Sequence, residues 1–169
     1  MNQPPSDFIR VGPGAHQQFL ESCLKKCGLA DEHAEHIARR LTWADLRGIH
    51  SHGAPQIERY VQNLQEGSIN PTPDIQLVRE EQAFLVVNGD GGLGYLPTAQ
   101  VTQKIIAKAL DCGVAAGSLH HIGHYGSASH YTHMCAEAGC VGFSVQGLVS
   151  GFDFPDLPIA LWGSRPISF

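Results

Sequence analysis

The 169-residue chain has no long apolar run and no excess of basic residues, and each absence excludes a class of protein. Lys and Arg number 11 against 16 Asp and Glu, the formal net charge is -5, and the basic residues are dispersed. Such a chain offers no basic stripe to a phosphate backbone, which argues against a nucleic-acid partner. No apolar run approaches the length needed to cross a bilayer, which argues against a membrane protein.

The N-terminal segment lacks the basic residues and apolar core of a secretory signal, and the cysteines form no Cys-x-x-Cys pair. Five cysteines are an odd number, which is typical of reduced thiols in a reducing compartment. We therefore expect a cytoplasmic protein. The 43% apolar and 16% charged content is that of a globular domain with a substantial core.

Apolar residues recur at helical spacing in three segments of the N-terminal part of the chain. Pro13 lies near the start of the first segment and Gly28 ends it, while Asp31 is the expected N-cap of the second. This pattern predicts a helical subdomain over residues 1–70. The expected helices are 13–27, 31–48 and 55–65.

The pattern changes after Pro71 and Pro73, where segments typical of strands begin to alternate with helical ones. This alternation predicts an α/β domain over residues 71–169. The sequence stops at Phe169 inside a further apolar segment, so we expect this domain to be incomplete. The expected strands are 75–79, 83–88, 114–119, 141–146 and 159–162, and the expected helices are 96–112 and 127–138.

Residues 89–94 read Gly-x-Gly-x-x-Gly between an expected strand and an expected helix, which is the context of a dinucleotide fingerprint. The acidic residue that should close the next strand is missing, since Asp111 precedes that strand. A structural glycine turn is therefore favoured. Five histidines between His120 and His133 suggest a metal site, but they lack the spacing of zinc ligands, so we predict no metal.

Two histidines stand on short segments that contain glycine. His52 follows Ser51, which would orient the ring or pass it a proton, and His124 lies two residues before Gly126. Imidazole has the side-chain pKa nearest neutrality, so the pair suggests proton transfer. For either histidine alone, a loop residue bonded to the backbone is the simpler interpretation.

These segments occur in the order and spacing seen in a known group of enzymes. The chain resembles the type 2 malate/L-lactate dehydrogenase family, with its ureidoglycolate, sulfolactate and cyclic-imine-reducing relatives, from about Phe19 to Ile167. The residues that carry the resemblance are Ala44-Asp45-Leu46-Arg47-Gly48-Ile49, Ser51-His52-Gly53, Tyr60, Leu64, Gly67, Ile69, Pro71, Asn88 to Gly94 and His124-Tyr125-Gly126.

The resemblance implies an α/β fold with a mixed sheet, distinct from the Rossmann fold, and a helical N-terminal subdomain. It implies hydride transfer between NAD or NADP and a 2-hydroxy or 2-oxo acid, in a homodimer. His124 would be the catalytic acid/base, and His52 with Ser51 would share in proton relay. Substrate binding would fall to Tyr60, Gln56 and Arg47, and cofactor binding to His52, Tyr125, Gly126, Gln146 and Gly147.

The chain departs from the family pattern at several positions. Gln56 stands where members commonly have an arginine suited to gripping a carboxylate, and a neutral amide cannot supply that charge. His50 stands where Asp is frequent, and Gln146-Gly147 replaces Thr-Asn. Family members are also considerably longer, so the resemblance predicts an N-terminal fragment. The alternative function is a non-catalytic binding or assembly module.

Overall fold

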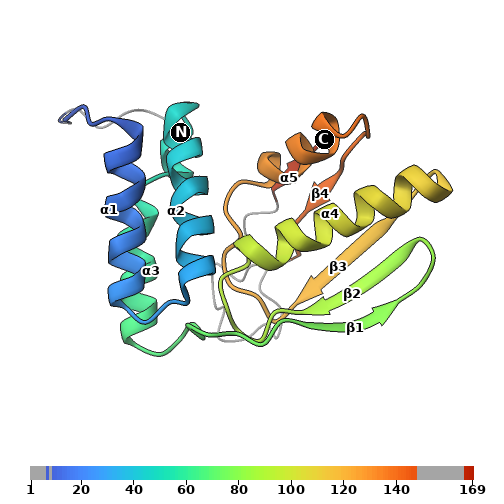
Figure 1. Cartoon of the computed structure of the whole chain (residues 1–169), viewed down its shortest axis with the longest axis horizontal. Coiled ribbons are helices and arrows are strands. Elements are labelled where there is room, and N and C mark those ends of the chain that lie inside the picture. The colour runs from blue at the N-terminus through green and yellow to red at the C-terminus, as the bar shows by residue number, and fades with distance from the viewer. Residues whose placement is uncertain (1–6, 8, 148–165) are drawn as a thin grey trace, which may run out of the picture.

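The computed structural model describes residues 7, 9–147 and 166–169. Three helices, α1 (Pro13–Lys26), α2 (Asp31–Leu46) and α3 (Gln56–Gln65), lie side by side and form one end of the molecule (Figure 1). The sheet and two further helices form the other end. No helix within the described residues is long and apolar enough to cross a membrane.

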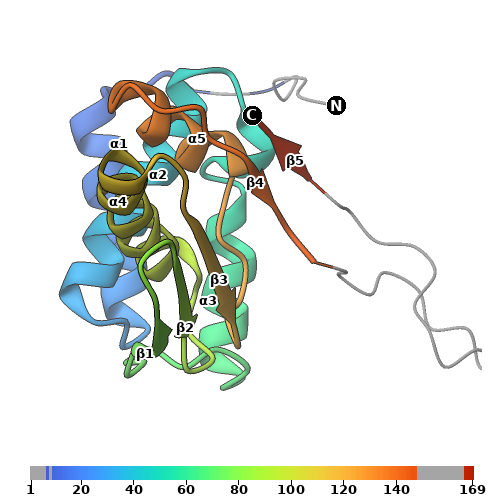
Figure 2. The ribbon, with the colours of Figure 1, turned by 90° about the vertical axis from the view of Figure 1, so that its right-hand side faces the viewer.

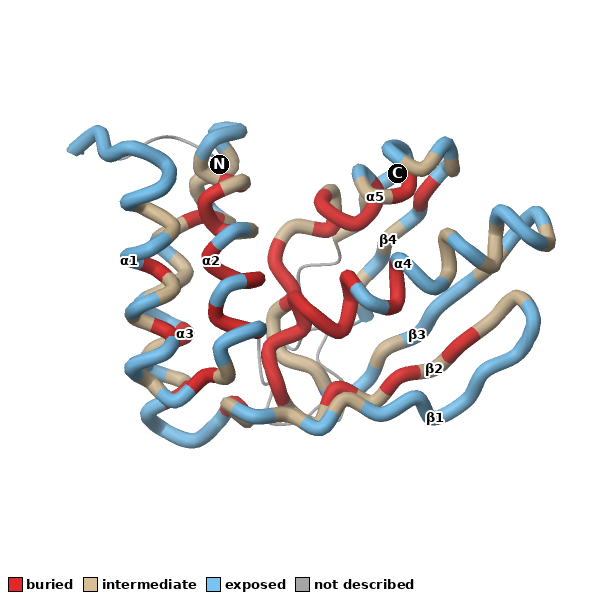
Figure 3. The backbone as a smooth tube through the Cα atoms, viewed as in Figure 1, coloured by how far each residue is buried: buried red, intermediate tan, exposed pale blue. Residues whose placement is uncertain are grey.

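The helical end has its own apolar core. α1 begins with Pro13 at its first turn, where a missing backbone N–H costs nothing, and buries Leu20 and Leu24 against its neighbours. Ile37 and Leu41 of α2 are fully buried against them. Figure 3 shows that the buried side of α2 continues onto the start of α4 and onto α5, so the two ends share a packed boundary.

The larger sheet has the order β1-β2-β3, with β1 (Gln76–Glu80), β2 (Phe84–Asn88) and β3 (Ala116–His120). β1 pairs antiparallel with β2, and β2 pairs parallel with β3, so the sheet is mixed as the family resemblance implies. α4 (Tyr95–Cys112) connects the parallel strands and packs on one face of them.

A two-stranded ladder follows α5 (Ala128–Glu137). β4 (Ser144–Val145) pairs antiparallel with β5 (Ile167–Ser168), and Figure 2 shows this ladder beside α5.

The glycines of residues 89–94 serve chain packing. Gly94 N–H donates to the carbonyl of His124 at 3.0 Å, and Gly123 N–H donates to the carbonyl of Gly92 at 2.8 Å. A Cβ at Gly94 would lie 2.8 Å from Cβ of Tyr125, closer than real side chains approach. The close approach of two backbone segments therefore explains these glycines without a bound dinucleotide.

The sequence-based boundaries need three corrections. Asp31 is wrong as an N-cap: Ala30 holds that position, and Asp31 begins the helix with its carboxylate 3.2 Å from Nζ of Lys25. The fourth expected strand shortens to Ser144–Val145, and β5 was not expected. The strand expected at 159–162 lies outside the described residues.

Two buried histidines at the boundary between α2 and α5 make the folding stability of the chain depend on pH. Burial, with Arg40 beside both rings, lowers the pKa of His36 to about 4 and that of His130 to about 3. Unfolded histidine takes up a proton near pH 6.5. The unfolded chain thus binds more protons below pH 6.5, and stability falls as the pH drops through that window.

We expect His36→Gln to reduce the loss of stability between pH 7 and pH 4.5 by on the order of 2 kcal/mol. Urea unfolding followed by circular dichroism at the two pH values measures this. His120→Gln is the control, because His120 is exposed on β3 and is not among the charges that act on His36 or His130, so it should leave the pH dependence unchanged. Equal acid sensitivity in both variants would show that His36 does not contribute.

Candidate active site

His124 lies at the end of a chain of buried hydroxyls. Its Nδ1 is 2.5 Å from the Tyr60 hydroxyl, which is 2.8 Å from the hydroxyl of Tyr95. Burial, and then the nearby charges of Arg59 and His52, lower the pKa of His124 to about 4, so its ring is neutral at pH 7. Burial raises the pKa of Tyr60 to about 12, so that hydroxyl keeps its proton. With Nδ1 engaged by Tyr60, Nε2 is the nitrogen left to exchange a proton.

His52 lies next to His124 although the two are far apart in sequence. Their rings stack with centroids 5.9 Å apart and planes inclined by 28°. Ser51 Oγ is 2.9 Å from Nδ1 of His52, which is the ring-orienting contact expected from their order in the sequence. Burial, and then the charge of Arg59, lower the pKa of His52. The structure thus brings the three residues predicted to handle protons into one place.

The turn that carries His52 is held by Asp45 at the end of α2. One carboxylate oxygen of Asp45 accepts the N–H of Ala54 at 2.7 Å, and the other lies 3.2 Å from Nδ1 of His50. The 3₁₀ turn η1 (His50–His52) is therefore fixed from both sides. A Cβ at Gly53 would collide with the Asp45 carboxylate, so this position needs glycine for space.

We expect Gly53→Ala to destabilise the chain by about 1–3 kcal/mol, because either the turn or the Asp45 side chain must move. Gly14→Ala is the matched control, since a Cβ there meets nothing and alanine favours the α1 helix. Urea unfolding of the two variants measures the difference. A Gly53→Ala protein as stable as Gly14→Ala would show that Asp45 does not clamp the turn.

An open groove of about 1280 Å³ passes His124. It collects residues from α3, β3, the segment that follows β3, and β4. Six of the residues predicted to bind cofactor or substrate line it together with His124, and their roles in binding stay predictions. These six are His52, Tyr60, Tyr125, Gly126, Gln146 and Gly147.

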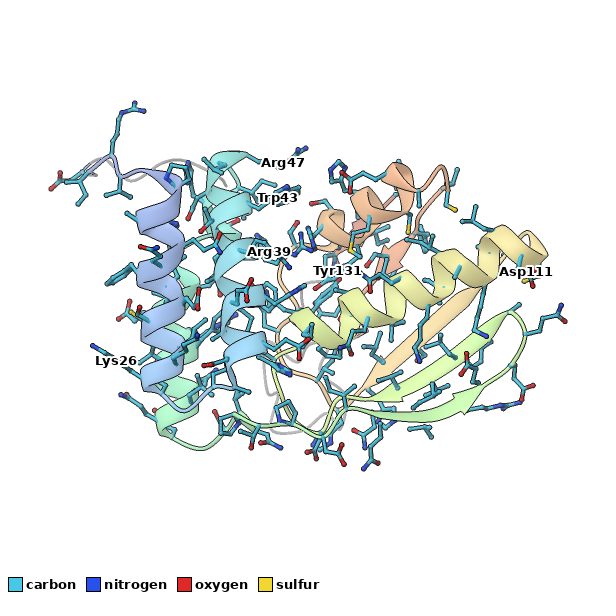
Figure 4. All side chains as sticks on the ribbon, in the orientation of Figure 1. Lys26, Arg39, Trp43, Arg47, Asp111 and Tyr131 are labelled. Carbon is cyan, nitrogen blue, oxygen red and sulfur yellow. The ribbon has the colours of Figure 1, made fainter. Side chains whose placement is uncertain are left out.

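Two predicted substrate-binding residues lie outside this groove. The Gln56 side-chain amide donates to the backbone carbonyl of Ser51 at 2.6 Å, so it supports the turn. Arg47 lies 4.6 Å from the ring centre of Trp43, and Figure 4 shows both at the C-terminal end of α2. That Gln56 and Arg47 contact the substrate also stays a prediction. A different positively charged side chain lines the groove.

That cation is Arg59, which the sequence analysis missed. It stands on α3 immediately before Tyr60, with its guanidinium 5.7 Å from the Tyr60 ring centre, and it lines the groove. Its charge is among the causes that lower the pKa of both His52 and His124. The available signal was its place one helical turn after Gln56, where the family's arginine is absent.

The histidines that follow β3 do not converge. His121 bonds to the side-chain carbonyl of Asn88, His130 is buried against Trp43, and His133 pairs with Glu137. In the part of the chain that the structure describes, no three His, Cys, Asp or Glu side chains are placed to hold a metal ion.

Comparison with known proteins gives a consistent result. Residues 13–150 match the family model described as malate/L-lactate dehydrogenase. Malate dehydrogenase of Pyrococcus horikoshii is 35% identical over 139 residues, which cover 82% of this chain and 39% of that protein. Ureidoglycolate dehydrogenase (NAD(+)) of Escherichia coli O157:H7 is 30% identical over 164 residues, 95% of this chain and 46% of that protein.

The solved structures agree with the sequence matches. The structure of malate dehydrogenase from Pyrococcus horikoshii OT3 superposes with a TM-score of 0.85 at 32% identity, covering 96% of this chain and 47% of that one. Sulfolactate dehydrogenase from Methanocaldococcus jannaschii gives 0.73 at 32% identity, covering 76% and 38%. The chain spans less than half the length of each of these relatives.

Proposed function

Because the chain belongs to the malate/L-lactate dehydrogenase family, we propose that it supplies the proton-transfer part of a nicotinamide-dependent dehydrogenase of 2-hydroxy acids. The observation that carries this proposal is the neutral His124, held by Tyr60 at one nitrogen and lining a groove. A neutral imidazole is the form that accepts a proton.

His124 Nε2 accepts the proton of the substrate hydroxyl during oxidation, and the resulting imidazolium returns it during reduction. The Tyr60 hydroxyl stays protonated and both donates and accepts, so it bonds to His124 in either protonation state. His52 forms the adjoining wall, and Ser51, hydrogen-bonded to its Nδ1, completes the proton relay with it. Tyr60 is thus a positioning residue for His124 as well as a predicted substrate contact.

A nicotinamide cofactor, when bound, accepts or supplies the hydride. The groove fits such a group, since its volume of about 1280 Å³ exceeds that of most small-molecule sites. Glycine backbone and the polar side chains of His52 and Gln146 line it. Of the two cofactors expected, NAD is the one named for a relative, and we propose NAD. His52, Tyr125, Gly126, Gln146 and Gly147 would hold it.

Arg59 takes the carboxylate of the substrate in this proposal. It is a permanent cation in the groove that His124 lines, and it can form two parallel hydrogen bonds with a carboxylate. Gln56 stands at the position of the family's arginine, and its side-chain amide already donates a hydrogen bond to the backbone carbonyl of Ser51. We also propose that residues 1–70 form a helical subdomain and residues 71–169 part of the α/β domain. The proposed assembly is a cytoplasmic homodimer.

A fluorescence titration of the chain with NADH tests the proposal directly. We expect a saturable change at concentrations on the order of micromolar, the range typical of enzyme ligands. His52→Ala should weaken binding, whereas His133→Ala, on α5 outside the groove, should leave it unchanged. No saturable change up to about 1 mM would favour the non-catalytic binding or assembly module.

A further inference from the structure

A second, smaller cavity lies behind the proton-transfer site, between α2 and the start of α5. Its volume is about 10 Å³, roughly the space of one water molecule. Its wall is built from α2, the segment after β3 and α5, and Figure 4 shows Trp43 of α2 on the side that faces Tyr131 of α5. The lining residues are Arg40, Trp43, Ala44, His52, Tyr95, Tyr125, Ser127 and His130.

His130 lines this cavity and has one buried ring nitrogen without a hydrogen-bond partner in the described part of the chain. The Arg40 guanidinium lies 3.4 Å from Nδ1 of His130. Guanidinium only donates, so Nδ1 accepts, and the neutral ring carries its proton on Nε2. His130 is 5% exposed, and its buried Nε2 has no hydrogen-bond partner within the described residues. An unpaired buried N–H costs about 1–3 kcal/mol, so an acceptor is expected there.

Arg40 adds a positive charge that forms no ion pair with the described residues. Its hydrogen-bond partners are His36 and His130, and no carboxylate of the described residues lies within ion-pair distance of it. The charge of Glu137 acts on Arg40 only from beyond that distance. Arg40 is partly buried, and burial is the main cause that lowers its pKa. The described residues that line the cavity include no Asp or Glu. A half-buried cation beside an unpaired donor is the setting of an anion.

We propose that this cavity binds a monoatomic anion of the chloride class, held by Arg40 and the Nε2–H of His130. The size of the cavity selects the ligand, because a space for one water excludes phosphate or sulfate but admits a halide after small side-chain shifts. Tyr125 and Ser127 also line the cavity.

The two residues that would hold the anion are separate from the proposed active site, since neither Arg40 nor His130 lines the groove that His124 lines. His52 and Tyr125 line both spaces. A bound anion would therefore place negative charge beside the proton-transfer residues without contacting the substrate.

The melting temperature of the chain in sodium chloride and in sodium gluconate, at equal ionic strength and pH 7, tests the proposal. We expect chloride at about ten times its dissociation constant to raise the melting temperature by about 3–6 °C. Arg40→Gln should abolish the difference. Arg39→Gln removes the same charge from an exposed neighbour on α2 and should retain it.

The wild-type chain provides a second measurement in case Arg40→Gln does not fold. Binding should broaden the chloride NMR resonance, and excess bromide should reverse the broadening. Equal melting temperatures in the two salts with no broadening would show that the cavity holds water only. A chloride effect that Arg40→Gln retains would place the anion elsewhere. Either result overturns the proposal.

Discussion

Replacing His124 with asparagine is expected to lower kcat by about 100- to 10,000-fold, the usual contribution of a general acid/base. Asparagine has an amide in place of the imidazole, so it retains polarity but cannot accept the hydroxyl proton. The measurement is the steady-state oxidation of 2-hydroxy acids by the full gene product, followed by the appearance of NADH. The affinity for NADH, measured by fluorescence, should change little, because the substitution removes the proton acceptor and leaves the rest of the groove in place.

His133→Asn is the matched control for His124→Asn. His133 lies on α5, outside the groove, and its ring contacts Trp43 and Glu137. Its loss should leave kcat unchanged. A His124→Asn protein with near-wild-type kcat would remove His124 from the mechanism, while the family assignment and the fold would stand.

Replacing Arg59 with glutamine is expected to raise KM for a 2-hydroxy acid by about 10- to 100-fold, the cost of losing a charge-assisted pair of about 1.5–3 kcal/mol. The wild type should prefer the acid to its uncharged amide, and the variant should lose that preference. Arg79→Gln is the control, since Arg79, on the exposed strand β1, pairs with Glu81 and does not line the groove. An unchanged preference in Arg59→Gln would assign the carboxylate to another residue.

Arg59→Gln should also move the pH profile. The Arg59 charge is one cause of the lowered pKa of His124, so its removal raises that pKa. The acid limb of kcat/KM should therefore shift toward higher pH, because the base becomes protonated earlier on acidification. Gln56→Arg in the same background restores the family residue and should lower KM again if the groove accepts a cation from that position.

Local patterns predicted the helices well because the information is local. Apolar spacing, Pro13 and the residues around Gly28 define α1 to within one residue of the expected end. The same reasoning placed β2 and α4 within one residue at their starts. β5 was missed because a two-residue strand has no periodicity, and it exists through its pairing with β4.

The site was only partly predictable for a different reason. The turn that holds His52 and the segment that holds His124 each carry a local signal, glycine beside histidine. The stacking of the two rings depends instead on how α3, through Tyr60, meets the segment that follows β3. The one local mark of Arg59 is its place one helical turn after Gln56, and its charge matters only because the fold brings it near both rings. Likewise, Arg40 and His130 are 90 positions apart, so no sequence pattern joins them.

The contact between residues 89–94 and the segment before α5 affects how a mutational scan of this chain should be read. A side chain at Gly94 would push on Tyr125 and on the carbonyl of Gly123, the residues on either side of His124. A Gly94 variant without activity would be interpreted as having a damaged nucleotide-binding loop, because residues 89–94 resemble one. The physical cause would instead be a displaced His124. A variant that still binds NADH but does not turn over substrate would distinguish the second cause from the first.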